Sequence, residues 1–334
     1  MESHPPPIQM VQLLSGFQVS QALYVAAKLG VADRLVDGPT PAGRLASDLD
    51  CDPLALSRLL RTLASLGVFS EAEPDVFGLT PLGATLASGD GSMRDLALMW
   101  METHYAPFAG LLDTVRSGRC AATAHYGQPF FSWLSGQPEQ VDQFSRAMAN
   151  LTDGIKAGAI ASYTFPASAT MVDVGGADGA LLARVLESAP DATGIVFDLP
   201  HVIAEAAATL KGYGLGDRMT SAGGDFFEAV PGGADVYLLS MVLHDWNDDD
   251  ATRVLANIRD AAAPGSRVLA LELVMPTGGQ PHMSKMIDLT MLGMLDGRER
   301  TESEMAALFE GAGLVYDGAV PTPTPLSIIE ARVP

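Results

Sequence analysis

Cysteine and positive charge are both scarce in this chain of 334 residues. Its two cysteines, Cys51 and Cys120, lie far apart and match no metal-binding or disulfide spacing, so we expect a reducing, cytoplasmic environment. No run of about 18 uncharged apolar residues occurs, and the N-terminus lacks the basic start and cleavage site of a signal peptide. The sequence therefore predicts neither a membrane span nor secretion.

The shortage of positive charge limits the partners. Lys and Arg number 20 against 40 Asp and Glu, which gives a formal net charge of -20. A chain this acidic repels phosphate backbones and anionic lipid surfaces, so we expect no nucleic acid and no membrane partner. Hydrophobic residues make up 48% of the chain, so a sizeable core can form, and the length suits two domains.

The N-terminal region predicts a helix over 8–36 that is apolar on more than one side. Such a helix is buried either in the core of its own chain or against a second subunit. The apolar residues that recur at helical spacing are Ile8, Val11, Leu14, Val19, Leu23, Val25 and Leu29.

Residues 40–88 predict a winged helix. Thr40 is placed to cap a short helix that ends near residue 49, and Asp52 precedes a proline that opens a second helix ending near residue 66. Candidate wing strands cover 68–69 and 76–79. Winged helices often bind DNA, but this wing carries Glu71, Glu73 and Asp75, which argues against that role.

Short strands alternate with helices from residue 166 onward, which predicts a parallel, doubly wound α/β sheet. The preceding segment, 90–165, predicts helices rich in methionine and aromatic residues, which form a core or line an apolar pocket. The expected strands cover 170–174, 194–197, 234–239 and 267–274, with a closing pair at 314–316 and 327–331, and the expected helices cover 180–188, 202–210, 251–263 and 303–311.

A glycine-rich turn, VDVGGADG over 172–179, follows the first strand of this sheet. A dinucleotide fingerprint would need glycine at 177 and 180, and both positions are alanine. An acidic residue followed by Gly175 and Gly179 is instead typical of S-adenosylmethionine sites, although a tight turn of any α/β protein could look the same. Asp198 ends the second strand, where a carboxylate can accept two hydrogen bonds from a ribose diol.

Two further segments fall where ligands bind in such sheets. GDFFEAVP over 224–231 should follow the third strand, so that Asp225 can accept from the adenine amino group and Phe226 can pack on the ring. LHDWNDD over 243–249 follows the fourth strand and places His244 beside Asp245 at the ligand cleft. A lone histidine is more often structural, but this position favours an active role.

With FDLPHVI, LELV and DGRERTESEM, these segments resemble the plant-type family of small-molecule, S-adenosylmethionine-dependent O-methyltransferases, in order and in spacing. The resemblance covers residues 171–309, and the winged-helix start extends it. It implies a Rossmann-like catalytic domain over 166–334, a helical linker over 96–165 that contributes to the substrate pocket, and a winged-helix dimerisation domain over 1–95. A homodimer is expected.

The resemblance also implies roles for single residues. His244 would be the general base, flanked by Glu272 and Glu299. Ser240 stands where many plant members have a cofactor-contacting lysine. Ala177 replaces a glycine of the turn, which matters only if the backbone there needs a positive φ. The expected cofactor residues are Gly175, Asp198, Leu199, Asp225, Phe226 and Ser240, and the expected substrate residues are Asp245, Met148, Thr290 and Met291.

The chemistry of methyl transfer fits these residue types. A phenol has a pKa of about 10 and attacks a sulfonium methyl well only once deprotonated, and a histidine with a pKa of about 6.5 can take that proton at neutral pH. We expect no metal, because a cation among His244, Glu272 and Glu299 would compete with the sulfonium. Two alternatives stay open: a relative that binds the cofactor without methylating, such as a hydroxylase or decarboxylase of polyketides, and a winged-helix binding protein.

Overall fold

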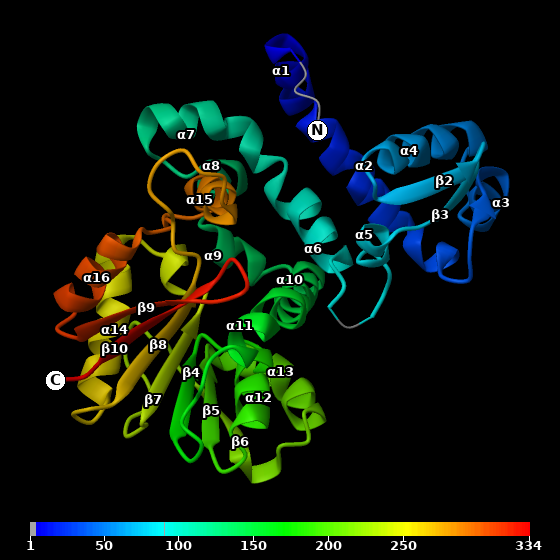
Figure 1. Ribbon diagram of the computed structural model, residues 1–334. Helices are drawn as coiled ribbons and strands as arrows, with labels where there is room; N and C mark the ends of the chain where they lie inside the picture. The colour runs from blue at the N-terminus through cyan, green and yellow to red at the C-terminus, as the bar shows by residue number, and fades with distance from the viewer. Residues whose placement is uncertain (1–4, 90) are drawn as a thin grey trace. The chain divides into compact units, whose positions relative to one another are not determined.

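The computed structural model describes residues 5–89 and 91–334, without the side chains of residues 152 and 153. The chain forms two compact units (Figure 1). Unit 1 comprises the residues up to Ala106 together with Pro138–Asn150, and unit 2 comprises Pro107–Gln137 and Leu151–Pro334. The segment 96–165, which we expected to act as one linker, is therefore divided between the two units.

The N-terminal helix of unit 1 is two helices, not one helix over 8–36. α1 (Pro6–Leu14) ends at Ser15, α2 (Gly16–Leu29) ends at Gly30 with a φ of 70°, and a 3-10 turn, η1 (Ala32–Leu35), follows. α2 buries Ala26 and Ala27 in the core of unit 1, whereas α1 buries no residue within the chain. The apolar side chains of α1 are therefore exposed on the single chain.

The winged helix is present, with α3 (Ala42–Asp48), α4 (Pro53–Ser65) and a sheet in the order β1-β3-β2. β1 is Thr40–Pro41, β2 is Phe69–Glu73 and β3 is Val76–Leu79. Asp52 caps α4 by accepting from the N–H of Ala55 at 2.8 Å, as expected. Thr40 does not cap α3, because it pairs with Phe77 in the sheet. The remaining helices of unit 1 are α5 (Pro81–Ala84), α6 (Arg94–Met99), a π-helix η2 (Trp100–His104) and α10 (Pro138–Leu151).

Unit 2 is built on a seven-stranded sheet in the order β6-β5-β4-β7-β8-β10-β9 (Figure 1). The first five strands in this order are parallel, and β10 is antiparallel to both of its neighbours, β8 and β9. This arrangement confirms the doubly wound fold. The strands are β4 (Thr170–Val174), β5 (Thr193–Asp198), β6 (Met219–Gly223), β7 (Val236–Ser240), β8 (Arg267–Glu272), β9 (Val315–Pro321) and β10 (Ser327–Arg332).

Helices cover both faces of this sheet because its strands are apolar on both sides. α12 (Ala180–Ser188) and α13 (Pro200–Gly212) pack on one face, and α14 (Asp248–Ala261) and α16 (Glu302–Gly311) pack on the other. Helix α15 (Met283–Met294) was not predicted. The shorter helices of unit 2 are η3 (Pro107–Gly110), α7 (Leu111–Ser117), α8 (Ala121–Tyr126), α9 (Phe130–Leu134), η4 (Thr152–Lys156), α11 (Ala157–Ala161), η5 (Gly216–Arg218) and η6 (Leu243–Asp245). Among the described residues, no helix combines the length and the apolar character needed to cross a membrane.

Candidate active site

The candidate site lies at the carboxyl ends of β4, β5, β7 and β8 in unit 2. β4 has β5 on one side and β7 on the other, so the chain changes direction at this point of the sheet. Open α/β sheets bind ligands at such switch points. All predicted site residues except Met148 belong to unit 2, and Met148 lies on α10 in unit 1.

The turn after β4 is held in place by backbone hydrogen bonds. Gly175 and Gly176 both donate their N–H to the carbonyl of Phe197, at 2.8 and 3.2 Å. Gly175 has a φ of +74°, and a Cβ there would lie 3.0 Å from Cγ2 of Val242. Ala177 has a φ of 48°, so the condition under which alanine is costly at this position is met.

Asp198 lies beside this turn at the end of β5. Its Oδ2 accepts from the N–H of Ala177 at 2.9 Å, and its Oδ1 accepts from the N–H of Leu199 at 2.7 Å. Each carboxylate oxygen keeps a second lone pair, so the side chain can still accept from a diol. Burial raises the pKa of Asp198, and the two backbone hydrogen bonds oppose that shift.

The segment after β6 supplies an aromatic surface. Asp225 Oδ1 accepts from the N–H of Phe227 at 2.8 Å, which shapes the turn. The ring of Phe226 packs edge-on against Phe227 at 4.9 Å and against Trp246 at 5.9 Å. The segment thus supplies aromatic surface on which a flat ring can pack, and its role as the adenine site stays a prediction.

His244 lies on η6, directly after β7, and is 4% exposed. Its Nδ1 is 2.8 Å from Oε1 of Glu299, and its Nε2 is 3.4 Å from Oδ1 of Asp245. Because Glu299 is an acceptor, Nδ1 carries a hydrogen and Nε2 is the atom that can take up a proton. Met241, three residues earlier, has a φ of 55°, which is a strained conformation of the kind found at functional sites.

The two glutamates expected to flank His244 do so in different ways. Glu299 bonds to the imidazole itself, whereas Oε1 of Glu272 accepts from the N–H groups of Val242 and Leu243 at 3.2 and 3.0 Å. Glu272 therefore holds the backbone that leads into His244. Glu299 is positioned in turn by Asp288 of α15, which accepts from its N–H at 2.9 Å.

Arg300, for which no role was predicted, fixes the other side of the same turn. Its side chain is fully buried and donates to the carbonyls of Leu243 and Trp246, both at 2.8 Å, and to Oδ1 of Asp248 at 2.9 Å. Gly297 allows this close approach, because a Cβ there would lie 2.0 Å from the carbonyl oxygen of His244.

The protonation of His244 differs from our expectation. Burial lowers the pKa of His244, but the carboxylates, first Asp245 and then Glu299, outweigh burial and raise it to about 10. In the cofactor-free protein His244 is therefore protonated at neutral pH, not neutral. Burial raises the pKa of Asp245 to about 6, and the charge of His244 opposes that shift.

The expected acceptor pocket is only partly described by the geometry. Met291 is 6% exposed and packs with Leu273 and Ile287, while Thr290 bonds back to the carbonyl of Met286 at 3.4 Å. Asp245, the third substrate residue expected in unit 2, lies beside His244, with its Oδ1 at 3.4 Å from Nε2. Elsewhere in unit 2, Phe131 packs near Trp246 with 6.4 Å between ring centroids.

Several buried polar atoms at the sheet edge have no hydrogen-bond partner among the described residues: Asp173 Oδ2, Ser240 Oγ, Glu272 Oε2 and Glu299 Oε2. Buried acceptors without partners are costly, so they are expected to meet donors of a ligand. The ligand atoms of His244, Glu272 and Glu299 also lie within 4.8 Å of one another, which is close enough for a cation. The site thus fits a ligand that carries positive charge and several donors.

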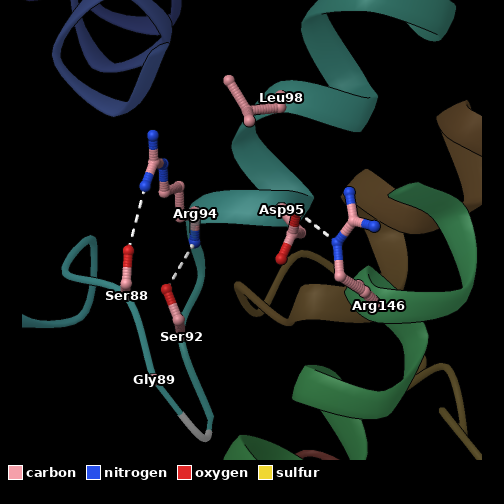
Figure 2. A pocket seen from close by; sticks show the side chains of 7 residues that line it. All are labelled: Ser88, Gly89, Ser92, Arg94, Asp95, Leu98 and Arg146. Atoms are coloured by element: carbon pink, nitrogen blue, oxygen red, sulfur yellow. Dashed lines mark hydrogen bonds and ion pairs between the residues drawn. The ribbon is translucent and has the colours of Figure 1, made fainter. Parts of the chain in front are cut away.

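A hollow in unit 1 has a different character (Figure 2). It has a volume of about 340 Å³, and its cations are already paired. Arg94 donates to the carbonyl of Ala27 and pairs with Asp33, and Arg146 pairs with Asp95 at 3.2 Å. These contacts join the helices of unit 1, and we assign the hollow a structural role.

Comparisons with known proteins identify both units. An O-methyltransferase domain model matches residues 108–315, and an O-methyltransferase dimerisation domain model matches residues 11–89. A phenazine O-methyltransferase of Lysobacter antibioticus is 42% identical over 324 residues, which cover 97% of this chain and 95% of the relative.

Two further relatives bear on cofactor and reaction. The solved structure of an O-methyltransferase from neocarzinostatin biosynthesis, in complex with S-adenosylmethionine and 2-hydroxy-5-methyl naphthoic acid, is similar with a TM-score of 0.80 and 33% identity, over 95% of this chain and 96% of that one. Aclacinomycin 10-hydroxylase of Streptomyces purpurascens is 35% identical over 336 residues, 96% of this chain and 89% of its own.

Proposed function

The chain belongs to the O-methyltransferase family, and on that premise we propose that it methylates a hydroxyl of a small aromatic secondary metabolite with His244 as the general base. The protein is an enzyme, an S-adenosylmethionine-dependent O-methyltransferase. The observation that carries the proposed mechanism is the 2.8 Å hydrogen bond between Glu299 and His244, which leaves Nε2 available at the switch point of the sheet.

Six residues are assigned to the cofactor. The glycine turn at Gly175 admits a ligand close to the backbone, Asp198 suits a ribose diol, and the buried acceptors at this edge suit the ammonium group of the amino-acid part. When bound, the cofactor supplies a methyl group on a positively charged sulfur. The assigned residues are Gly175, Asp198, Leu199, Asp225, Phe226 and Ser240.

His244 would take the proton of the acceptor hydroxyl on Nε2, and the resulting oxyanion would accept the methyl group. Glu299 stabilises the imidazolium that forms, while Glu272 fixes the backbone that orients the ring. The base must first be neutral. A cation beside these carboxylates weakens their hold on the proton, so cofactor binding is expected to lower the pKa of His244.

The acceptor is expected to be flat and apolar. Met291 and the aromatic group around Trp246 supply apolar surface, and Asp245 can bond to the reacting hydroxyl. Relatives act on phenazines, or were solved with a naphthoic acid, which supports an aromatic substrate. Thr290 remains assigned to this pocket, and the role of Met148 in unit 1 stays an expectation from the resemblance.

A homodimer is proposed through unit 1. The dimerisation domain model covers the N-terminal helices, and α1 exposes Leu13 at 76% and Leu14 at 69% of their surfaces. Apolar groups gathered on a helix with no buried residue indicate an interface.

His244→Gln tests the proposed base. This variant should bind S-adenosylhomocysteine with unchanged affinity and lose transfer by at least about 100-fold, because general-base catalysis contributes roughly 10²–10⁴-fold. His125→Gln, which replaces an exposed histidine of α8, is the matched control and should transfer normally. Full activity in His244→Gln would contradict the base assignment.

The similarity to a hydroxylase keeps one alternative in view, namely cofactor binding without methyl transfer. Our proposal predicts that methylated product and S-adenosylhomocysteine form in equal amounts from a panel of phenolic and polyketide acceptors. Product that forms without S-adenosylhomocysteine would favour the alternative.

A further inference from the structure

Lys156 is a buried amine to which neither the fold nor the proposed chemistry gives a role. It ends the π-helix η4, and 7% of its surface is exposed. Lysine is rarely buried without a partner, because its ammonium loses its hydration. A buried lysine beside an active site therefore calls for an explanation.

The position of η4 places Lys156 at the carboxyl edge of the sheet. The preceding residue, Ile155, packs against a cluster that contains Leu273, directly after β8, and Met291 of α15. The same cluster includes Met241, directly after β7. η4 also contacts α12, the helix that follows the glycine turn.

Four carboxylates interact electrostatically with the Lys156 ammonium, in decreasing order Asp173, Glu272, Asp178 and Asp245. Asp173 and Asp178 belong to the glycine-turn segment. Glu272 and Asp245 belong to the surroundings of His244. The ammonium is therefore within electrostatic range of both the glycine turn and the carboxylates around His244.

The Lys156 ammonium has no partner among the described side chains, which exclude those of residues 152 and 153. They show no hydrogen bond or ion pair of Lys156, and Oδ2 of Asp173 also has no partner among them. In the same part of the chain, Arg300 is the other buried Lys or Arg side chain, and its donors are taken by two carbonyls and Asp248. Lys156 is thus the buried cation whose donors no other described side chain takes up.

We propose that Lys156 binds the carboxylate at the amino-acid end of S-adenosylmethionine. The inference rests on the cofactor site proposed above. The surrounding acids suit the ammonium and sulfonium charges of that ligand, but its one carboxylate would be repelled unless a cation meets it. Lys156 supplies that cation beside the glycine turn, where Asp173 and Asp178 lie. Lys156 would also supply the positive charge that is missing at Ser240, where many plant members of the family have a lysine.

Two probes separate this role from others. S-adenosylhomocysteine carries the carboxylate, whereas 5′-methylthioadenosine has the same nucleoside and sulfur without the amino-acid part. Calorimetric titration of Lys156→Met should show about 10- to 100-fold weaker binding of S-adenosylhomocysteine, the range of a charge-assisted hydrogen bond. Binding of 5′-methylthioadenosine should stay within about twofold of wild type, because that probe has no group for Lys156 to bind.

Three controls complete the experiment. Lys211→Met removes an exposed charge from α13 and should leave both affinities unchanged, and Lys156→Arg should recover much of the lost affinity. The melting temperature of ligand-free Lys156→Met should equal or exceed that of wild type, because an unpaired buried charge is removed.

Several results would overturn the proposal. Equal losses for both probes would mean that the substitution disturbs the whole nucleoside site, and no loss for either would mean that the carboxylate is bound elsewhere. A lower melting temperature with unchanged affinities would mean that Lys156 serves only as a counter-charge for Asp173. A raised KM confined to carboxylated acceptors, at unchanged cofactor affinity, would transfer the role to the acceptor. Since binding is measured without turnover, failure of the methyl-transfer proposal would leave this test intact.

Discussion

Replacing Arg300 tests how the turn that carries His244 is held. The guanidinium bridges the carbonyls of Leu243 and Trp246, on either side of His244, and reaches Asp248 at the start of α14. The three acceptors are met by three different nitrogens of the guanidinium, and lysine has a single nitrogen that cannot lie near all of them. Arg300→Lys should therefore leave the turn under-bonded while keeping the charge.

The magnitude follows from the bonds that are lost. Two of the three contacts of Arg300 should fail, and hydrogen bonds to charged groups contribute about 1.5–3 kcal/mol each, so the free energy of unfolding should fall by roughly 3–6 kcal/mol. The free energy of unfolding of a domain is about 5–15 kcal/mol in total, so the variant should still fold. A misplacement of His244 by about 1 Å would cost roughly 100-fold in kcat.

The assay pairs urea unfolding with steady-state kinetics. Arg298→Lys is the matched control, because Arg298 is 43% exposed in its side chain, also contacts Asp248, and makes no bond to the turn. Its unfolding free energy should change by less than about 1 kcal/mol, as for other surface pairs. In Arg300→Lys, kcat should fall much more than the affinity for S-adenosylhomocysteine. Wild-type kcat and stability in Arg300→Lys would refute the idea that Arg300 holds the turn that carries His244.

Three other perturbations follow from the same structure. Ala177→Gly should raise the unfolding free energy by about 1 kcal/mol, because φ at that position is positive; a loss of stability in thermal melts would contradict this. His244 has a pKa raised to about 10 in the folded chain, so its stabilising contribution is full below the unfolded value of about 6.5 and is lost as pH rises through about 10. Urea unfolding between these pH values should therefore lose stability more steeply in wild type than in His244→Gln, and equal slopes would rule this out. Leu13→Asp should shift the sedimentation mass from two chains toward one, and an unchanged mass would place the interface elsewhere.

Much of the catalytic fold can be predicted from the sequence, because its strands are short, apolar and separated by clear turns. The expected strand over 170–174 and helix over 180–188 match β4 and α12 residue for residue. Helix α15 was missed because its apolar residues are spread around the helix, so no periodic stripe marks it. The break at Ser15 was missed for the same reason, since α1 and α2 share one continuous apolar pattern.

The identity of the site residues was predictable from their type and their place after a strand. Their hydrogen-bond partners were less predictable. His244 and Glu299 could be paired from their motifs, and the structure brings them to 2.8 Å. That Glu272 bonds to the backbone rather than to the imidazole depends on where β8 ends relative to β7, which spacing does not reveal. The raised pKa of His244 has the same origin, because it is the sum of charges from three separate segments.

Lys156 and Arg300 carry no sequence signal of their role. Each is a single basic residue in a chain with 20 of them, and only burial distinguishes these two from the exposed ones. The orientation of the segment after α15, with Gly297 against the turn, decides where Arg300 points.

The place of β10 in the sheet sets the order in which the catalytic unit can be completed during synthesis. β10 lies between β8 and β9 and pairs with six residues of each, so it is an interior strand although it follows both of them in the sequence. Before residues 327–332 leave the ribosome, β8 presents an unpaired apolar edge, and β9 has no strand to pair with. A chain that is cut before residue 327 should therefore expose this edge and aggregate.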